Sequence, residues 1–426
     1  MDYFVVVHTN RENNSDVSIV DDDMLPACFF LSNHMCSSFA DLSFNTRLTY
    51  AKVLLFVFRY FAVKSIDLPV RVESGELLTR EEYDEFKRYC KYKEEAEIED
   101  QKVVSFARFS DKRLDNLIHA THSTENKVSA NTVKMRLRQF IDYISYLYHT
   151  FHFANNTPAV VRQNYVDFEL LLKSDIQNIR NENADVKDPF EKSIPDDIFL
   201  KLLEIIKPFS PDNPWTESSR TRNKLIVDIF IETGIRLGAL NKLKISDIKE
   251  GAEGTRLHIT RNPNDPTDPR KLSPAQKTKA HSSSITTDTR RILKLYIETE
   301  RSKYAKANTH DFVFVGTKGN NKGLPITNDR VYKIIKTLSD AVNFPLHPHL
   351  FRHKWNEIFD EKATSAGYSP AQLEDLRKYA MGWVENSKMS TVYNNFRHAM
   401  KIHVLSAQRQ KDAVPSQQVN SNDNRE

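Results

Sequence analysis

The densest group of side chains that could do chemistry lies at residues 347–354, which read HPHLFRHK. Five of these eight residues are cationic or can become so, yet Leu350, Phe351 and the following Trp355 are apolar. Arginine presents a planar fork of donors that fits the oxygens of an oxyanion, and a neighbouring imidazole can donate, accept or pass a proton. The segment alone is equally compatible with a salt-bridged arginine and a core histidine. It therefore raises the question of a phosphate site.

A metal site is the other chemistry that this segment suggests. His349 and His353 stand four residues apart, as two zinc ligands on a helix would. In the zinc-protease pattern a glutamate follows the first histidine, because it must activate the metal-bound water, and here that position is Leu350. Arg352 and Lys354 would also repel a dication. We therefore expect no metal and no cofactor.

Three other segments of the C-terminal half carry candidate residues. Arg236 comes two residues after a helix-ending glycine in ETGIRLGALNKLKISDI, residues 232–248. Lys277 and Lys279 precede a short alternating stretch within residues 274–288. Trp383 and Tyr393 lie ten residues apart in MGWVENSKMSTVYNNF, residues 381–396.

Taken in their order along the chain, these four segments resemble the catalytic domain of the tyrosine recombinases, also called the phage-integrase family. The resemblance covers about residues 193–400. The family's first box, a TG-x-R turn before a leucine-rich helix, is matched by Thr233, Gly234, Arg236, Leu240, Leu243, Asp247 and Ile248. Its second box, H-x-x-R-H, is matched by His349, Arg352 and His353. Its L-G-[HW] element resembles Met381-Gly382-Trp383, its nucleophile Tyr393, and its strand-borne lysine Lys277, with Lys279 as the alternative.

The resemblance implies a catalytic set and a reaction. The set is Arg236, Lys277, His349, Arg352, Trp383 and the nucleophile Tyr393, with His353 in support. The tyrosine would attack a DNA phosphodiester and leave a 3′-phosphotyrosine, so that neither ATP nor metal is needed. The two arginines would hold the non-bridging oxygens, the lysine would protonate the leaving 5′-oxygen, and the first histidine would assist proton transfer. The tryptophan would donate a hydrogen bond and pack the site.

Three positions depart from the family's pattern. Ala239 stands three residues after the first arginine, where an acid is usual, which weakens the orienting hydrogen bonds or transfers them to another residue. Residues 363–378 form an expected insertion before Trp383, and the spacing from Trp383 to Tyr393 is about one residue long. Tyr368 and Tyr379 are rival nucleophiles by position. None of these departures removes a residue on which the reaction depends.

The elements that must position these residues can be placed by periodicity. Apolar residues at helical spacing predict helices at 43–63, with a cap at Asn45 or Thr46, and at 129–151. Further helices are expected from Pro195, before Gly234 and at 327–342, and short strands at 256–262, 281–288 and 311–316. The expected fold is mainly α with a small antiparallel sheet, in the two-domain clamp that the resemblance implies.

The expected domains differ in charge. They are an N-terminal extension (1–39), a helical DNA-binding core-binding domain (40–180), a linker (181–192), the catalytic domain (193–404) and a disordered tail (405–426). Residues 1–191 hold 23 basic and 30 acidic side chains, a net −7, whereas residues 192–404 hold 35 and 24, a net +11. A polyanionic partner therefore fits the second half better.

The basic stretch 102–138 is either a solvated helical face or a phosphate-contacting module. The expected DNA-binding residues are Lys112, Arg113, Lys134, Arg136, Arg138 and Lys279.

Composition favours a protein without membrane spans. No apolar run reaches the roughly 18 residues that a span needs, the N-terminus lacks a signal-peptide pattern, and the three cysteines have no ligand-like spacing. We expect a cytoplasmic, nucleoid-associated protein. Its expected partners are double-stranded DNA, three further copies in a homotetramer on two DNA sites, and accessory DNA-binding proteins.

The function that the resemblance implies is site-specific recombination or integration through a Holliday junction, serving a mobile element. One alternative is an enzyme of the type IB topoisomerase or telomere-resolving kind. Another is a structural or regulatory DNA-binding protein that retains a degenerate recombinase fold.

Overall fold

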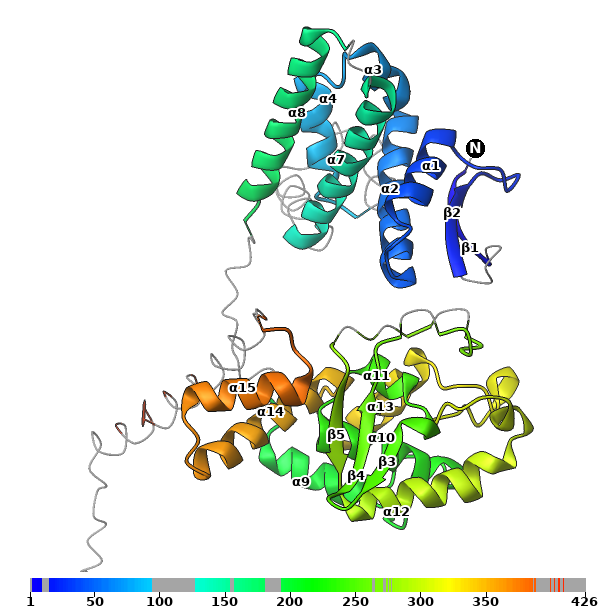
Figure 1. The fold of residues 1–426 in the computed structure, drawn as a ribbon, viewed down its shortest axis with the longest axis vertical. Helices are drawn as coiled ribbons and strands as arrows, with labels where there is room; N and C mark the ends of the chain where they lie inside the picture. The colour runs from blue at the N-terminus through cyan, green and yellow to red at the C-terminus, as the bar shows by residue number, and fades with distance from the viewer. Residues whose placement is uncertain are drawn as a thin grey trace, which may run out of the picture. The chain divides into compact units, whose positions relative to one another are not determined.

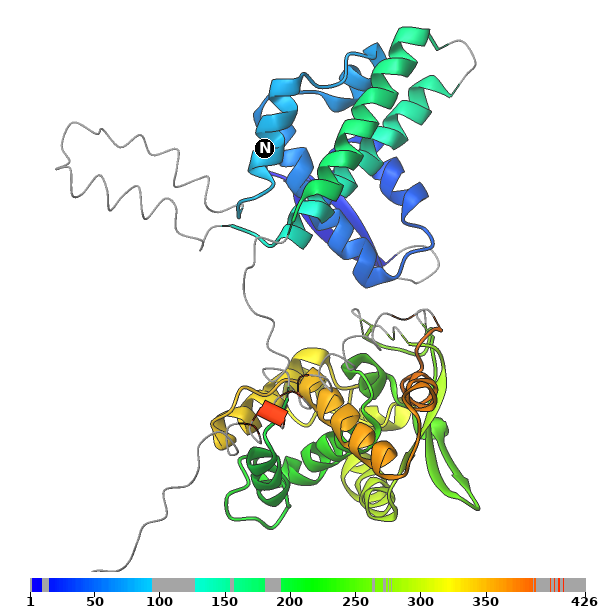
Figure 2. The same ribbon diagram turned by 90° about the vertical axis from the view of Figure 1, so that its left-hand side faces the viewer.

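The chain divides into two compact units, Met1–Asp185 and Val186–Glu426, which are described separately. The computed structural model describes residues 2–9, 15–93, 127–153, 157–180, 193–262, 265–270, 273–274, 276, 278–385 and 387, together with 399, 402, 405–406 and 409 (Figures 1 and 2). Most of the basic stretch 102–138, the linker 181–192 and nearly all of the tail therefore lie outside the described residues.

The first unit is a helical bundle built on two long amphipathic helices. Its helices are α1 (Phe29–Ser38), α2 (Phe44–Val63), α3 (Leu68–Ser74), α4 (Arg80–Tyr89), α7 (Ala130–His152) and α8 (Ala159–Asn178). Ser43 and Ser129 cap α2 and α7 by accepting hydrogen bonds from main-chain N–H groups, which fixes where the two helices begin. The core between them is aromatic, with the rings of Phe61 and Phe140 stacked at 5.4 Å.

A β-hairpin precedes the bundle, where the sequence suggested only an extension. Strands β1 (Phe4–Thr9) and β2 (Ser15–Val20) pair antiparallel, and both lie against α2. Val17 and Ile19 are buried in the same core as the helices. Residues 1–39 are thus part of the first unit, because the hairpin and α1 contribute to its packing.

The second unit combines helices with a three-stranded antiparallel sheet, as predicted. Its helices are α9 (Asp196–Ile205), α10 (Glu217–Thr233), α11 (Leu237–Lys242), α12 (Thr287–Leu295), α13 (Asn328–Val342), α14 (Pro348–Ser365) and α15 (Pro370–Met381). Short helical turns occupy Ile245–Asp247, Tyr296–Glu300, Arg301–Lys303, Ala305–Thr309 and Gly319–Asn321. The strands are β3 (Ile248–Gly251), β4 (Gly254–Ile259) and β5 (His281–Ile285), in the order β3-β4-β5.

Packing in the second unit brings the motif-bearing elements together. Helix α10 packs against α14, where the rings of Phe230 and Phe351 stack at 6.0 Å, and α10 also contacts β5. Helix α15 contacts both α14 and β5 (Figure 1). No helix among the described residues is long and apolar enough to cross a membrane.

Candidate active site

The first candidate residue, Arg236, stands on a tight turn between two helices. Helix α10 ends at Gly234, whose φ of 58° lies in the left-handed region. A Cβ at Gly234 would come 2.9 Å from both Met381 Cε and Trp355 Cγ, so the position must lack a side chain. Arg236 then caps α11 with extended backbone. The turn therefore packs directly on α14 and α15.

Arg352 connects three of the sequence motifs. Its side chain is buried, with 2% of the residue exposed. Its guanidinium donates to Gly234 O at 2.7 Å and to Met381 O at 3.4 Å. The guanidinium carbon lies 5.7 Å from the centre of the Trp383 ring, within cation–π range. Arg352 thus fixes the first-box turn and the Met-Gly-Trp turn to α14.

The lysine-bearing connection reaches the same place through its main chain. Lys279 N donates to Gly382 O at 2.9 Å. Gly382 ends α15 with a φ of 61°, and a Cβ there would lie 2.8 Å from Lys279 O and nearer still to His281 Nδ1. The start of β5 and the end of α15 are therefore in contact that only a glycine allows.

His281 is a residue of this site that the sequence patterns missed. Its Nδ1 lies 2.9 Å from Lys279 O, which makes Nδ1 the donor. Burial lowers the pKa of His281, and the positive charges of Arg352 and Arg236 lower it further. The only signal in the sequence was its place two residues after Lys279, at the start of a predicted strand. His281 thus lies within electrostatic reach of both arginines, which disfavour its protonated form.

Three further cationic residues of HPHLFRHK lie on α14 and form two groups. His349 is exposed and His353 half-buried, with ring centres 4.8 Å apart. Lys354 is buried and forms ion pairs with Asp196 at 2.5 Å and Glu357 at 2.8 Å, so it anchors α14 to α9. Leu350 and Phe351 are buried in the core of the second unit. Among the described residues no cluster of three or more metal-ligating side chains occurs.

Several predicted site residues fall outside the described residues or have other partners. Lys112, Arg113, Lys277 and Tyr393 are outside the described residues. Lys134 is half-buried, whereas Arg138 and Lys279 are exposed. The guanidinium of Arg136 donates to Cys90 O at 2.9 Å and Tyr92 O at 2.7 Å, and lies 3.7 Å from the centre of the Phe56 ring. These contacts tie α7 to the end of α4. The rival tyrosines, Tyr368 and Tyr379, are exposed.

Sequence comparisons found a matching family model and a curated relative. Residues 197–397 match the model of the phage integrase family. The tyrosine recombinase XerD of Halalkalibacterium halodurans is 28% identical over 182 residues, which cover 41% of this chain and 54% of the relative. The chain thus spans about half the length of that curated relative.

Solved structures similar to this chain include two recombinases bound to DNA. The XerH site-specific recombinase in a pre-cleavage complex with difH is 16% identical with a TM-score of 0.47, over 88% of this chain and 84% of that one. Lambda integrase bound to DNA is 13% identical with a TM-score of 0.34, over 67% and 81% of the two chains.

Proposed function

We propose that the chain is a site-specific DNA recombinase or integrase of the tyrosine-recombinase family, serving a mobile element, because residues 197–397 match the phage integrase family model. It would cleave and rejoin DNA through a 3′-phosphotyrosyl intermediate and a Holliday junction. The observation that carries the proposal is the position of Arg352, whose guanidinium holds the Gly234 and Met381 carbonyls together. Three motifs far apart in the sequence thereby meet at one buried cation.

In the proposed cleavage step, the Tyr393 oxygen forms a bond to phosphorus and the bond from phosphorus to the 5′-oxygen breaks. Arg236 and Arg352 would stabilise the charge on the two non-bridging oxygens. A fixed arginine suits this role, because its planar donors need little reorganisation when the charge develops. The phosphotyrosyl ester would conserve the energy of the broken bond, so the reverse step can rejoin the DNA.

Two protons must move in this step. The one on Tyr393 would leave with assistance from His349, whose exposed imidazole stands three residues before Arg352 on α14. The leaving 5′-oxygen would receive a proton from Lys277, or from Lys279 as the alternative. Trp383 and His353 would support the phosphate pocket, since the Trp383 ring lies beside Arg352.

The DNA partner is proposed from charge as well as from family. Residues 192–404 carry a net +11, which would favour contact with phosphates. The proposed phosphate contacts are Lys134, Arg138 and Lys279, together with Lys112 and Arg113. Arg136 would contribute mainly by holding α7 on α4. Four copies would assemble on two DNA sites, with accessory DNA-binding proteins as further partners.

Recovery of covalent protein–DNA adducts from fragmented genomic DNA tests the proposal. The wild-type chain and Tyr393→Phe are each incubated with nicked fragments that trap the cleaved state, and the attached ends are sequenced. We expect adducts at one shared sequence with the wild type alone. Adducts without a shared sequence, with relaxation of any supercoiled plasmid, would instead support a topoisomerase-like enzyme. Binding without any adduct would support a DNA-binding protein that has lost catalysis.

A further inference from the structure

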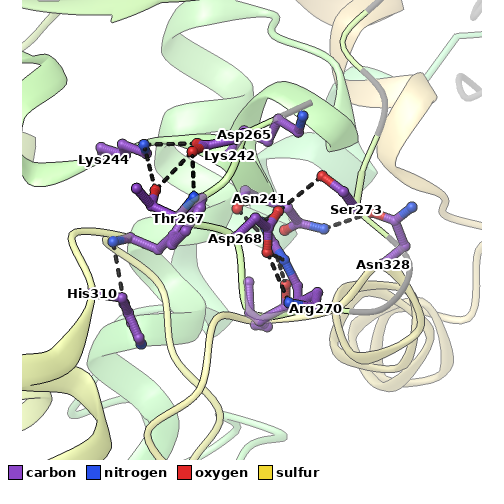
Figure 3. A network of polar contacts seen from close by, with 12 residues as sticks. Asn241, Lys242, Lys244, Asp265, Thr267, Asp268, Arg270, Ser273, His310 and Asn328 are labelled. Carbon is purple, nitrogen blue, oxygen red and sulfur yellow. Dashed lines mark hydrogen bonds and ion pairs between the residues drawn. The ribbon is translucent and has the colours of Figure 1, made fainter. Parts of the chain in front are cut away.

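A cluster of charged and polar side chains holds the connection between β4 and β5 (Figure 3). We name it the loop clasp and define it as Asp265, Asp268, Arg270 and Ser273 of the connection with Asn241 and Lys244, which lie at and just after the end of α11. The connection runs for 21 residues, from the end of β4 at Ile259 to the start of β5 at His281. Connections this long, without secondary structure of their own, are usually functional or disordered. This one carries both lysine candidates.

Arg270 is the centre of the loop clasp. Its Nε and one terminal nitrogen donate to the two carboxylate oxygens of Asp268, both at 2.8 Å, and these side chains are only 6% and 1% exposed. Its other terminal nitrogen donates to Asn241 O at 3.0 Å and Ile326 O at 2.7 Å. Arg270 therefore joins the connection to the last turn of α11 and to the segment that precedes α13.

The other members of the loop clasp form two further hydrogen bonds and a second ion pair. Ser273 Oγ donates to Asp268 at 2.9 Å, so the clasp extends to within four residues of Lys277 along the chain. Lys244 Nζ forms an ion pair with Asp265 at 2.7 Å. The Asn241 amide donates to Asn328 at the start of α13 at 2.7 Å. The connection is thus bound to α11, to Lys244 and to Ile326, and the Asn241–Asn328 bond joins α11 to α13.

The burial of the Arg270–Asp268 ion pair points to a role in positioning rather than to a contribution to net stability. A buried ion pair loses much of its Coulomb attraction to desolvation, and well-packed apolar residues of similar volume often serve stability equally well. What such a pair adds is a defined geometry, since bidentate contact fixes both distance and direction. Helix α11 then relays that geometry, because Arg236 caps one end and Arg270 holds a carbonyl at the other. Arg236 and Asn241 are five positions apart on the helix, a rise of about 7.5 Å.

We propose that the loop clasp is a positioning device that sets the connection carrying Lys277 and Lys279 at a fixed distance from Arg236, so that the lysine can protonate the leaving 5′-oxygen. This inference rests on the proposed recombinase function. The members of the loop clasp would not themselves contact the DNA phosphate. They act through the placement of the proton donor.

A sulfur-substituted substrate tests this role. A 5′-thiolate leaves from phosphorus without protonation, because a thiol is far more acidic than an alcohol. A defect in placing the proton donor should therefore disappear on DNA that carries sulfur in place of the scissile 5′-oxygen. A general loss of folding or of DNA binding would persist on both substrates.

The experiment measures single-turnover cleavage by the full chain at the DNA site that adduct mapping identifies. For Asp268→Asn we expect cleavage of the oxygen substrate to slow by on the order of 10²-fold, the scale of a 1 Å misplacement, and cleavage of the sulfur substrate to stay within about threefold of wild type. Ser273→Ala removes one hydroxyl contact and should give the same selectivity at smaller size. Arg222→Lys alters a buried arginine that donates to Val315 O at 3.0 Å, outside the clasp, and is the matched control. It should show no selectivity between the substrates.

Equal slowing of both substrates by Asp268→Asn, or no slowing, would overturn the inference. If Asp268→Asn does not fold, the same criterion applies to Ser273→Ala. Failure of the proposed function is recognised separately, since the wild-type chain would then form no adduct with either substrate.

Discussion

Replacing Gly382 with alanine should uncouple the lysine-bearing connection from α15. Gly382 has a φ of 61°, and Gly367, which follows α14, has a φ of 82°. An alanine at either position adopts a left-handed conformation, at a cost of roughly 1 kcal/mol. A Cβ at Gly367 meets no atom within 4 Å, so Gly367→Ala measures that conformational cost alone.

At Gly382 the methyl group adds a collision. It would lie 2.8 Å from Lys279 O and closer to His281 Nδ1, so the connection must move away. That movement breaks the hydrogen bonds from Lys279 N to Gly382 O and from His281 Nδ1 to Lys279 O, both 2.9 Å. Each is worth about 1 kcal/mol. We therefore expect Gly382→Ala to lower the free energy of unfolding by about 3 kcal/mol, against about 1 kcal/mol for Gly367→Ala.

Tryptophan fluorescence during urea unfolding is a suitable assay. All three tryptophans of the chain, Trp215, Trp355 and Trp383, lie in the second unit, so the signal reports that unit alone. Cleavage of trapped DNA should fall by on the order of 10²-fold in Gly382→Ala and stay near wild type in Gly367→Ala. Equal destabilisation and equal activity of the two variants would refute the close contact between α15 and the connection.

Three further predictions follow from individual contacts. Burial lowers the pKa of His34 from 6.5 to about 4. The first unit should therefore keep its full stability above about pH 6.5 and lose up to about 3 kcal/mol as the pH falls toward 4. Hydrogen exchange of α1 should show this loss, and His34→Phe should remove it. Arg136→Ala should lower the thermal stability of the first unit, because it removes the contacts with Cys90 and Tyr92. Replacing the exposed Arg138 with alanine should instead reduce DNA affinity and lower the slope of log affinity against log salt concentration by about one. The reverse pattern would contradict the contacts of Arg136. Lys354→Met should destabilise the second unit by roughly 3 kcal/mol, because it leaves Glu357 without the 2.8 Å ion pair, and a urea midpoint equal to wild type would contradict this.

The long helices could be predicted because each buries one face. Apolar residues at 3–4 spacing predicted helices at 43–63 and 129–151, and the structure has α2 and α7 there. The cap of α2 was misplaced, since Ser43 accepts the hydrogen bond instead of Asn45 or Thr46. The hairpin of β1 and β2 was missed because it buries little beyond Val17 and Ile19, too few residues to make a clear alternating pattern.

The apolar run at 311–316 shows what periodicity cannot decide. It was predicted as a strand, and Phe312 and Val313 are indeed buried. Its hydrogen bonds are nevertheless divided, with Val313 N donating to Leu243 O and Ile326 N donating to Phe314 O, so only isolated bridges form. The apolar pattern reports burial, whereas the pairing depends on distant segments that the pattern does not contain.

Site residues could be predicted where the residue type itself determines the chemistry. They could not be predicted where the role depends on contacts with residues distant in the sequence. Arg352 could be chosen from its motif, but its bond to Gly234 O spans 118 residues. His281 and Arg270 match no motif, and their importance comes from the carbonyls and charges around them. Ala239, marked in the sequence as a departure, is buried within α11.

The proposed cleavage requires Tyr393 to form a covalent bond to DNA, so the residue that becomes attached to DNA can be identified directly. The wild-type chain is trapped on its cleavage site and digested, and the peptide that retains a nucleotide is sequenced by mass spectrometry. We expect a 3′-phosphotyrosyl link at Tyr393 and no adduct with Tyr393→Phe. A link to Tyr368, Tyr379 or any other residue, or an adduct that persists in Tyr393→Phe, would contradict it.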